Sequence, residues 1–448
     1  MRMNEQSAMT AQLECLRCRA RYDLDQVRYL CTCGGQLDVS HDLAALRAQV
    51  SRSTFDGRLR GAPSPQVRPE VDSGVWRYRE LILPLPPEAI VSRPEGNTPL
   101  YEDRRLSDWV AVESLWLKHE GENPSGSFKD RGMTVGVTQA RWLGARAVAC
   151  ASTGNTSASL AAYAALAGIP SIVFIPAGKV AAGKLAQALA YGACTLQVAG
   201  DFDDAMRLVQ RVCDELGIYL LNSLNPFRLE GQKSIVFEIV HGLGWQPPDW
   251  IVLPAGNLGN TAAFGKALHE LRQLGLIDRM PRLASVQAEG ANPFYRSYAE
   301  GFQQPVTMAA ETVATAIRIG APVSYERAVR SMRWTDGIVA QVSDAEIMDA
   351  KAMVDRTGIG CEPASAASVA GVRKLVAEGT IHADQTVVAV LTGNLLKDPG
   401  ATVGYHTGEW PEALYANRPR VVGADVDSVR RVVEEMLEGV IRCQRSYE

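Results

Sequence analysis

The residues on either side of Lys129 form a pattern that a solvent-exposed lysine would not need. It lies in "ENPSGSFKDRG", Glu122 to Gly132, behind a loop of Asn, Pro, Ser and Gly and just before an apolar helical pattern. A buried lysine most often forms a salt bridge, but it can also act as a nucleophile when it is held as a neutral amine. The other polar loops of the chain decide between these two interpretations.

Two of these loops have the composition of anion sites. "PAGNLGN", Pro254 to Asn260, follows an apolar strand pattern and begins a helix. Its glycines allow close approach, and the helix N-terminus offers free N–H groups to a phosphate. It matches neither a nucleoside-triphosphate loop nor a dinucleotide motif. "ASTGNTSAS", Ala151 to Ser159, places hydroxyls, an amide and a glycine at another helix start, which suits a carboxylate.

These loops together predict a phosphate-bearing cofactor and an amino-acid carboxylate beside Lys129. A lysine that forms a Schiff base usually receives an aldehyde cofactor that is anchored by its phosphate. A third polar loop, "LTGN" at Leu391 to Asn394, also ends an apolar strand pattern. Because ligands bind outside the carboxyl ends of parallel strands, we expect the three loops to share one site. The alternative is that they are ordinary strand-to-helix turns, which also favour Gly and Asn.

The elements that must position these loops follow an α/β pattern. From Asn97 onward, near-continuous apolar strand patterns alternate with amphipathic helical patterns, as in "RAVACAS" before "TSASLAAYAALAG" and "WIVLPAGN" before "TAAFGKALHELRQLG". Such alternation indicates parallel sheets that are covered by helices on both faces. A chain of 448 residues is also long for one core, so we expect two or more domains.

Four of the nine cysteines fall within a short N-terminal segment. Cys15, Cys18, Cys31 and Cys33 form the pattern C-x2-C-x12-C-x-C-G-G, two knuckles that could present four thiolates to Zn²⁺. The second knuckle is one residue shorter than usual, so a ribbon that folds without metal is the alternative. The scattered cysteines are expected to be thiols in a reducing compartment.

Composition and charge exclude several classes of partner. The net charge of −4 and the absence of a basic run argue against a nucleic-acid partner. The most apolar stretch, 158–175, is divided by Gly168 and Pro170 and fits a buried helix, turn and strand better than a membrane span. The first residues lack the apolar core of a secretory signal. We therefore expect a cytoplasmic protein without a membrane partner.

The sequence patterns divide the chain into four regions. The tail "DVDSVRRVVEEMLEGVIRCQR" has helical spacing and is expected to pack as a terminal helix. "GAPSPQVRP" is the clearest linker. The predicted regions are a Cys-rich zinc-ribbon-like module at 1–40, a linker and N-terminal arm at 41–95, a catalytic region at 96–410 with a smaller subdomain inserted at about 131–235, and a helical tail at 411–448.

The ordered set of motifs resembles the fold-type II pyridoxal-phosphate enzymes, the tryptophan synthase beta-like family, and within them the threonine synthases. The resemblance runs from Cys15 to Pro399 and also covers the Cys ribbon. It implies two doubly wound parallel-sheet domains with the cofactor between them. The motifs that carry it are "GVWRYRELILP", "EGNTPL", "NPSGSFKDRGM", "ASTGNTSAS", "NSLNPFRLEGQKS", "PAGNLGN", "TAIRIGAPVS" and "LTGNLLKDP".

The resemblance also implies a role for each matching residue. Lys129 would carry pyridoxal 5'-phosphate as a Schiff base and shuttle protons. Asn155 would hydrogen-bond the phenolic oxygen of the cofactor, and Thr392 would face its pyridine nitrogen. The backbone expected to hold its phosphate is that of Gly256, Asn257, Leu258, Gly259 and Asn260. The residues expected to bind the substrate are Ser152, Thr153 and Thr156 near its carboxylate, and Ser223 and Arg228 at its phosphate.

The reaction implied by the resemblance converts O-phospho-L-homoserine and water to L-threonine and phosphate. Lys129 would remove a Cα proton and help to remove a Cβ proton, after which phosphate would leave from Cγ. Protonation at Cγ and addition of water at Cβ would complete this γ-elimination and β-replacement. Arg228 would matter twice, because the departing phosphate assists the protonation at Cγ. The resemblance further suggests a homodimer.

Three residues depart from the usual family motifs. Ala321 replaces the Asn of "IRIGNP", and Asn394 and Leu395 replace the His-Gly of "LTGHGLKDP". The loss of His removes a titratable group near the ring, and Leu adds bulk there. A related enzyme, cysteate-synthase-like or of specialised metabolism, could instead combine phosphoserine or phosphohomoserine with another nucleophile. A non-catalytic binder of small amino acids is a further alternative, although an intact Lys129 argues against it.

Overall fold

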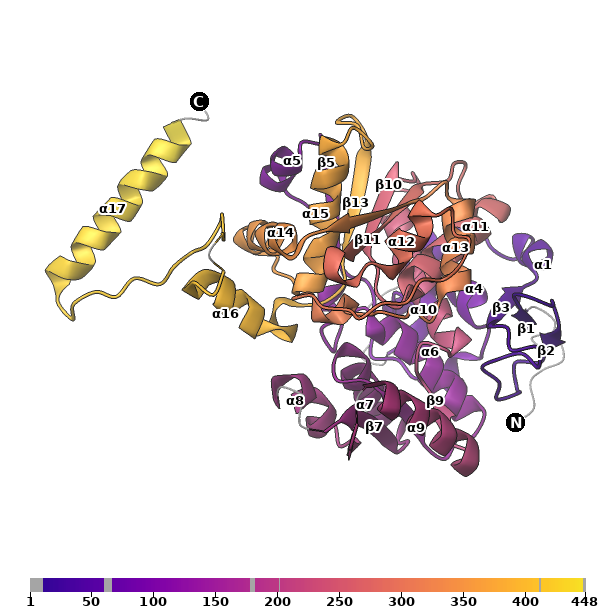
Figure 1. The fold of residues 1–448 in the computed structure, drawn as a ribbon. Coiled ribbons are helices and arrows are strands. Elements are labelled where there is room, and N and C mark those ends of the chain that lie inside the picture. Colours follow the sequence, from indigo (N-terminus) through magenta and orange to yellow (C-terminus); the bar gives the residue numbers. More distant parts are fainter. Residues whose placement is uncertain (1–10, 60–66, 178–181, 201, 411, 446–448) are drawn as a thin grey trace.

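The structure of the protein is a computed structural model that describes residues 11–59, 67–177, 182–200, 202–410 and 412–445. The first ten residues of the predicted Cys-rich module and most of the predicted linker at 61–69 lie outside the described residues. Figure 1 shows a small ribbon near the N-terminus, a body of two helix-covered sheets, and a long C-terminal helix that stands away from the body.

The largest sheet has six strands in the order β12-β11-β10-β13-β5-β4. Neighbouring strands run parallel except for the edge pair of β4 and β5, which is antiparallel. A parallel sheet of this kind needs helices on both faces, which the chain supplies between its strands. The strands are β4 (Leu100–Glu102), β5 (Ser114–His119), β10 (Trp250–Pro254), β11 (Arg282–Ala288), β12 (Ile338–Val342) and β13 (Thr386–Leu391).

Successive side chains of the central strands enter two different cores. Ile251 and Leu253 of β10 pack with one group of helices, while Trp250 and Val252 pack with the other. This alternation follows from the period of two of a strand. The first group is α10 (Pro226–Gly242), α11 (Gly259–Gln273) and α13 (Tyr325–Trp334), and the second is α5 (Arg104–Val110), α14 (Asp344–Arg356) and α15 (Pro363–Ala377).

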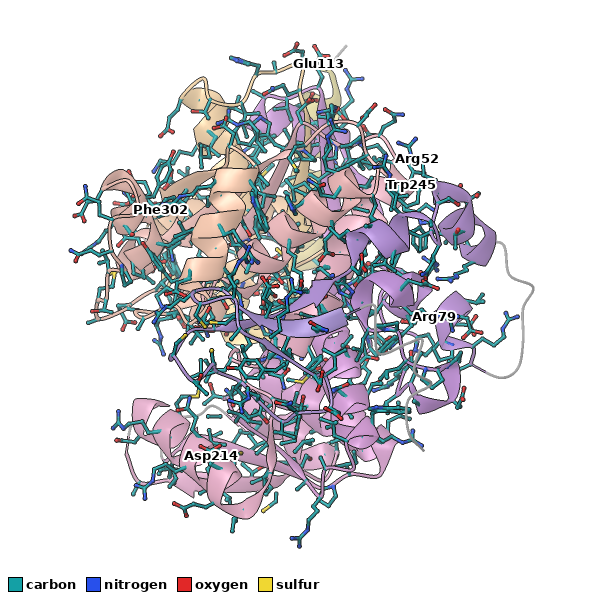
Figure 2. All side chains as sticks on the ribbon, turned by 90° about the vertical axis from the view of Figure 1, so that its right-hand side faces the viewer. Arg52, Arg79, Glu113, Asp214, Trp245 and Phe302 are labelled. Carbon is teal, nitrogen blue, oxygen red and sulfur yellow. The ribbon has the colours of Figure 1, made fainter. Side chains whose placement is uncertain are left out.

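A smaller sheet forms a second lobe. Its four strands run parallel in the order β8-β7-β6-β9. In Figure 2, Asp214 marks this lobe and Glu113 the opposite end of the body. The two parallel-sheet lobes confirm the predicted α/β fold class. The strands are β6 (Val148–Ala151), β7 (Ser171–Pro176), β8 (Cys194–Val198) and β9 (Tyr219–Leu220), with α6 (Lys129–Trp142), α7 (Asn155–Ala167) and α8 (Ala182–Ala190) on one face and α9 (Phe202–Leu216) on the other.

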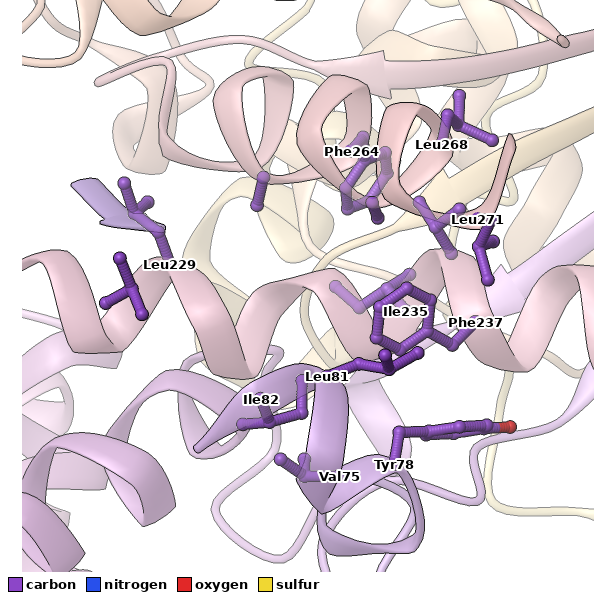
Figure 3. Packing of buried hydrophobic residues seen from close by; sticks show 14 of the residues in the cluster. Val75, Tyr78, Leu81, Ile82, Leu229, Ile235, Phe237, Phe264, Leu268 and Leu271 are labelled. Carbon is purple, nitrogen blue, oxygen red and sulfur yellow. The ribbon is translucent and has the colours of Figure 1, made fainter. Parts of the chain in front are cut away.

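The N-terminal ribbon shares its core with the body. Leu13, Leu37 and Val39 are buried in the same cluster as α10 and α11. Figure 3 shows α10 packed between α11 and the arm that follows the ribbon, with Phe237 of α10 beside Tyr78 of the arm. The ribbon strands are β1 (Ala11–Cys15), β2 (Arg21–Tyr22) and β3 (Leu37–His41), and the helices of the arm are α1 (Leu43–Arg47), α2 (Arg52–Leu59), α3 (Pro69–Asp72) and α4 (Arg79–Ile82).

The C-terminal tail is helical but does not pack as expected. Helix α12 (Pro293–Ala299) comes between β11 and α13 in the chain. After α16 (Pro399–Thr407), the chain leaves the body and ends in α17 (Val426–Arg445), which stands apart (Figure 1). Met436 and Leu437 of α17 are 55% and 50% exposed. The apolar spacing therefore predicted the helix and not its separation from the body. No helix of the described chain has both the length and the apolar character that a membrane crossing needs.

Candidate active site

A cavity of about 1160 Å³ opens where the loops of the two larger sheets meet. The loops that follow β6, β10 and β13 all contribute to its wall, as expected for the carboxyl ends of parallel strands. The structure brings every residue predicted for the cofactor and the substrate to this cavity: Lys129, Ser152, Thr153, Asn155, Thr156, Ser223, Arg228, Gly256, Asn257, Leu258, Gly259, Asn260 and Thr392.

Lys129 lies at the first turn of α6, where its surroundings favour the neutral amine. Burial and, next, the positive charge of Arg228 lower the pKa of Lys129 to about 7. The Lys129 Nζ lies 3.7 Å from the centre of the Phe128 ring. Among the described residues, no salt bridge or hydrogen bond engages this Nζ. The salt-bridge interpretation of Lys129 is therefore not supported by the structure.

The loop before Lys129 is fixed from two directions. The Phe128 N–H donates to the carbonyl of Thr392 at 3.0 Å, which ties the loop to the end of β13. The carboxylate of Asp130 accepts from the N–H and the hydroxyl of Ser125, at 2.6 and 2.5 Å, and from the Ser159 hydroxyl at 2.5 Å. The Asn-Pro-Ser-Gly run thus folds back onto Asp130, the residue after the lysine. These contacts on both sides of Lys129 fix the position of its backbone.

The loop before α11 is built as an anion cradle. Leu258 adopts a left-handed conformation with φ 64°, and α11 begins at Gly259 with its first N–H groups free of helical partners. A Cβ at Gly256 would meet the Cα of Ile317 at 3.0 Å, which is a tight contact, so glycine fits this position best. The Oδ1 of Asn260 is buried without a hydrogen-bond partner among the described atoms. These residues fit a phosphate-bearing cofactor.

Arg228 is a buried cation without an anion. Its side chain is 4% exposed, and its Nη1 donates to the carbonyl of Leu221 at 3.2 Å. Its Nε has no partner, and no carboxylate of the described chain lies within salt-bridge distance. Burial lowers the pKa of Arg228 to about 10. A guanidinium that is left with free donors at a cavity wall provides a site for a phosphate or a carboxylate.

Asn222 joins the substrate loop to the residues around Arg228. Its Oδ1 accepts from the Ala151 N–H at 2.9 Å, and its Nδ2 donates to the Ala151 carbonyl at 3.0 Å. The end of β6, which carries Ser152 and Thr153, is therefore held beside Ser223. One side-chain amide fixes the relative position of the expected carboxylate and phosphate subsites.

Several polar residues of the cavity were not predicted from the sequence. They include Gln232, one turn beyond Arg228 on α10, Glu362 at the start of α15, and Lys397, whose Nζ contacts Gln187 of α8. Glu362 precedes a proline in "CEPASAAS" and resembles an ordinary helix start. Gln232 lies on α10, a helix that is buried on all sides and carries other polar residues. Neither pattern carries a signal of function by itself.

The departures from the family motifs differ in their distance from the site. Asn394 lines the cavity, whereas neither Leu395 nor Ala321 contributes to its described wall. The Asn394 N–H donates to the carbonyl of Gly126 at 2.9 Å, and its Oδ1 accepts from the Leu396 N–H at 3.0 Å. Asn394 therefore supports the loop before Lys129 and caps a turn, which are roles that do not need an imidazole.

The four cysteines of the ribbon lie close together in space, and none of them belongs to the described wall of the cavity. Cys15 and Cys33 Sγ are 3.5 Å apart, Cys18 and Cys31 Sγ are 3.4 Å apart, and all four lie within 4.8 Å of one another. A hydrogen bond from the Tyr22 hydroxyl lowers the pKa of Cys31 to about 5 and favours a thiolate. The short second knuckle therefore does not prevent the cluster that a four-thiolate zinc site needs.

Comparisons with known proteins agree with this geometry. The family described as "Pyridoxal-phosphate dependent enzyme" matches residues 91–393. The chain is similar to the threonine synthase of Methanosarcina acetivorans, with 47% identity over 94% of this chain and 98% of that protein. It is 44% identical to the threonine synthase of Methanocaldococcus jannaschii over 94% of this chain and 99% of that protein. Threonine synthase 2 of Arabidopsis thaliana is 42% identical over 93% of this chain and 83% of that protein.

Solved structures share the fold at lower identity. The processed form of threonine deaminase isoform 2 from Solanum lycopersicum superposes with a TM-score of 0.61 and 21% identity, over 76% of this chain and 95% of that chain. Maize serine racemase gives a TM-score of 0.59 and 21% identity, over 72% and 93%. The chain thus belongs to the pyridoxal-phosphate-dependent enzymes and, within them, to the threonine synthases.

Proposed function

We propose that this protein converts O-phospho-L-homoserine and water to L-threonine and phosphate. One observation carries the proposal: the cavity that holds the neutral Lys129 has two separate places for a phosphate, the loop before α11 and the unpaired Arg228. A cofactor phosphate occupies the first. The second then serves a substrate that carries its own phosphate, which an unphosphorylated amino acid would leave empty.

The cofactor is held by residues of both lobes. Lys129 would bind pyridoxal 5'-phosphate covalently, the N–H groups at Gly256 to Asn260 would hold its phosphate, and Asn155 and Thr392 would hydrogen-bond its ring substituents and nitrogen. When bound, the conjugated ring of the cofactor stabilises the electron pair that remains after a proton leaves the substrate. The hydroxyl of Thr392 accepts or donates one hydrogen bond, whereas a carboxylate at this place would hold a permanently protonated ring nitrogen.

Lys129 Nζ moves the protons. With a pKa near 7, the amine is neutral in a large fraction of molecules at physiological pH, so that it can accept a proton from the substrate Cα and return it elsewhere. Its fixed place above the Phe128 ring keeps the same nitrogen within reach of neighbouring substrate carbons. A single base can therefore serve the proton transfers at Cα and Cβ.

Arg228 and Ser223 bind the phosphate of the substrate, and Ser152, Thr153 and Thr156 bind its carboxylate region. Arg228 stabilises the negative charge that grows on the phosphate as the bond to Cγ breaks, because its guanidinium lines the cavity and has no carboxylate partner among the described residues. It then retains the product phosphate next to Cγ, where that anion can pass on a proton. Water adds at Cβ to give threonine, so that atoms balance between substrates and products.

The test measures phosphate release and the amino-acid product with O-phospho-L-homoserine and O-phospho-L-serine side by side. We expect phosphate and threonine in equal amounts from phosphohomoserine and at most slow phosphate release from phosphoserine. Faster turnover of phosphoserine with a non-aqueous nucleophile would identify the related β-replacement activity. A protein that binds both compounds and releases no phosphate from either would be a binding protein and would overturn the proposal.

We propose in addition that the ribbon holds a structural zinc ion and that the protein acts as a cytoplasmic homodimer. The four-thiol cluster supports the zinc, and all described cysteines are free thiols, which suits a reducing compartment. The homodimer is supported by family likeness. Metal analysis that finds up to one zinc per chain and light scattering that finds a dimer mass are the expected results.

A further inference from the structure

Glu362 places a buried carboxyl group in the cavity. Its residue is 4% exposed, and it directly precedes α15 as the N-cap. The shorter carboxylate of Asp often caps its own helix from this position, but the side chain of Glu362 makes no capping hydrogen bond. The carboxyl group is instead directed at residues of other elements, so helix capping does not explain its burial.

The partners of Glu362 are two residues that face the cofactor in the proposed function. The Asn155 Nδ2 of α7 donates to Glu362 Oε2 at 3.0 Å and approaches Oε1 at 3.3 Å. The Thr392 hydroxyl of β13 donates to Oε1 at a longer 3.4 Å. Gly393 makes room for the carboxyl group, because a Cβ there would lie 2.5 Å from Glu362 Cδ and Oε1.

The contact with Asn155 has a chemical consequence. A side-chain amide can present either its N–H groups or its carbonyl oxygen, and only the N–H side can donate to a phenolic oxygen. A carboxyl oxygen at 3.0 Å engages one N–H of Asn155 and so turns the NH₂ group toward the cavity wall that Glu362 forms. The second N–H of the same group remains for another acceptor.

We propose that Glu362 is a positioning residue of the active site, which fixes the Asn155 amide so that its free N–H is presented to the phenolic oxygen of the cofactor. This inference rests on the proposed cofactor site. Glu362 acts by reach: a side chain that is one methylene shorter loses the contact even when it keeps the charge. An amide of the same length keeps the contact, because its carbonyl oxygen can accept from Asn155.

The charges near Glu362 agree with a role that does not require ionisation. Burial raises the pKa of Glu362, while the hydrogen bond from Asn155 and the positive charges of Lys129 and Lys397 lower it in part. The negative charge of Asp398 also raises the pKa of Glu362. Either protonation state leaves at least one carboxyl oxygen that can accept from Asn155, so replacement by Gln is a fair imitation.

The test follows the visible absorbance of the bound cofactor as a function of pH in the holoenzyme without substrate. The phenolic oxygen belongs to the absorbing system, so losing a hydrogen bond to its ionised form raises the midpoint of the transition. We expect Glu362→Asp and Glu362→Ala to raise this midpoint by about one pH unit and Glu362→Gln to stay close to wild type. With phosphohomoserine, the first two variants should lose about tenfold in kcat with a smaller change in KM.

Equal midpoints for wild type, Glu362→Asp and Glu362→Ala would overturn the inference, and so would a Glu362→Gln variant that shifts as far as Glu362→Asp. If the alanine variant does not fold, the Asp and Gln pair still decides the question. Glu346→Ala is the matched control, because Glu346 completes the capping box of α14 outside the cavity. It should lower stability and leave the midpoint unchanged. The spectral measurement needs no substrate, so it stands even if the proposed reaction is wrong.

Discussion

Helix α10 carries two buried cations with opposite surroundings. Arg228 lines the cavity and has no carboxylate partner in the described chain. Lys233, little more than one turn later, contacts Glu230 and Glu270, each at 2.6 Å, and the carbonyl of Leu81 at 2.5 Å. The same helix therefore leaves one cation unsatisfied beside the cavity and surrounds another with acceptors.

The pKa values of two other buried residues, Lys129 and Lys266, show the same contrast between an unpaired and a paired buried cation. Burial lowers the pKa of Lys129 to about 7, since no carboxylate lies close enough to compensate fully. Burial would also lower the pKa of Lys266, but Asp38, Glu230 and Glu270 raise it above its ordinary value. A buried charge without a partner is expensive, and proteins keep one where a ligand or a reaction uses it. The cavity is the functional region, and the paired cluster joins the ribbon to α10 and α11.

The largest expected effect is the loss of all turnover in Lys129→Ala. Of the two lysines that line the described cavity wall, Lys397 contacts Gln187 whereas the Nζ of Lys129 makes no hydrogen bond, so we expect no other side chain to replace the covalent bond to the cofactor or the proton transfers. Borohydride treatment of the wild-type holoenzyme followed by peptide mapping should label Lys129, and the variant should lack this label. A label on Lys397 in the wild type would contradict the assignment.

The same substitution at the two lysines should change stability in opposite directions. In cofactor-free protein at pH 6, Lys129→Met should raise the free energy of unfolding by up to about 5 kcal/mol, since its pKa falls from 10.5 to about 7 on folding. Lys266→Met should lower it by about 3–5 kcal/mol, because Asp38 and Glu230 lose their partner. Urea denaturation with both variants measures the two changes.

The pH dependence gives an internal check on the Lys129 variant. Between pH 7 and 10.5 the unfolded chain holds a proton that native Lys129 has released, so wild-type stability rises with pH in this window. The gain from Lys129→Met is therefore full below pH 7 and disappears above 10.5. A gain that is constant across this range would show that the substitution acts through packing and not through the buried charge.

Substitution of two buried arginines should distinguish a residue that binds substrate from a residue that stabilises the fold. Arg228→Ala should reduce kcat/KM for phosphohomoserine by a factor that corresponds to about 2–5 kcal/mol and leave the cofactor spectrum unchanged. Arg131 donates to Glu120 at 2.5 Å and to Glu238 at 2.6 Å, and Arg131→Ala should instead lower the free energy of unfolding by about 3–5 kcal/mol. Near-native kcat/KM in Arg228→Ala would place the substrate phosphate elsewhere.

The smallest catalytic effect is expected at the ribbon. Cys15→Ser removes one thiolate of the four-cysteine cluster, so it should lower the Tm and the zinc content while kcat stays close to wild type. Glu346→Ala, which lies outside both regions, serves as a control for a general loss of stability. A zinc-free protein that remains folded and is inactive would show that the ribbon takes part in catalysis.

The sequence predicted the residues of the cavity better than it predicted the buried ion pairs that join the ribbon to α10 and α11. The loops around Lys129, Gly256 and Thr392 each combine small and polar residues at a strand end, and parallel sheets bring such ends together. The contact of His41 with Glu230 joins residues that are far apart in the chain, and nothing local announces it. Glu362 was not predicted as a site residue, because the residues around it are typical of an ordinary helix start.

The tail shows a further limit of sequence patterns. The period of apolar residues in α17 indicates a helix with one apolar face, which the structure confirms. The period does not say which surface that face meets, and α17 meets no described part of the body closely enough to bury it. Periodicity reports on the element, whereas its docking depends on a partner surface that the period does not encode.

Helix α10 also has a practical meaning for redesign. Its residues Arg228 and Gln232 border the substrate space, while Glu230, Lys233 and Glu238 hold the ribbon, the arm and the central helices in place. A library that varies only the first two positions can explore new leaving groups on an intact scaffold. A library that includes the other three would select mainly for survival of the fold, so the helix divides evolvable positions from constrained ones within a few turns.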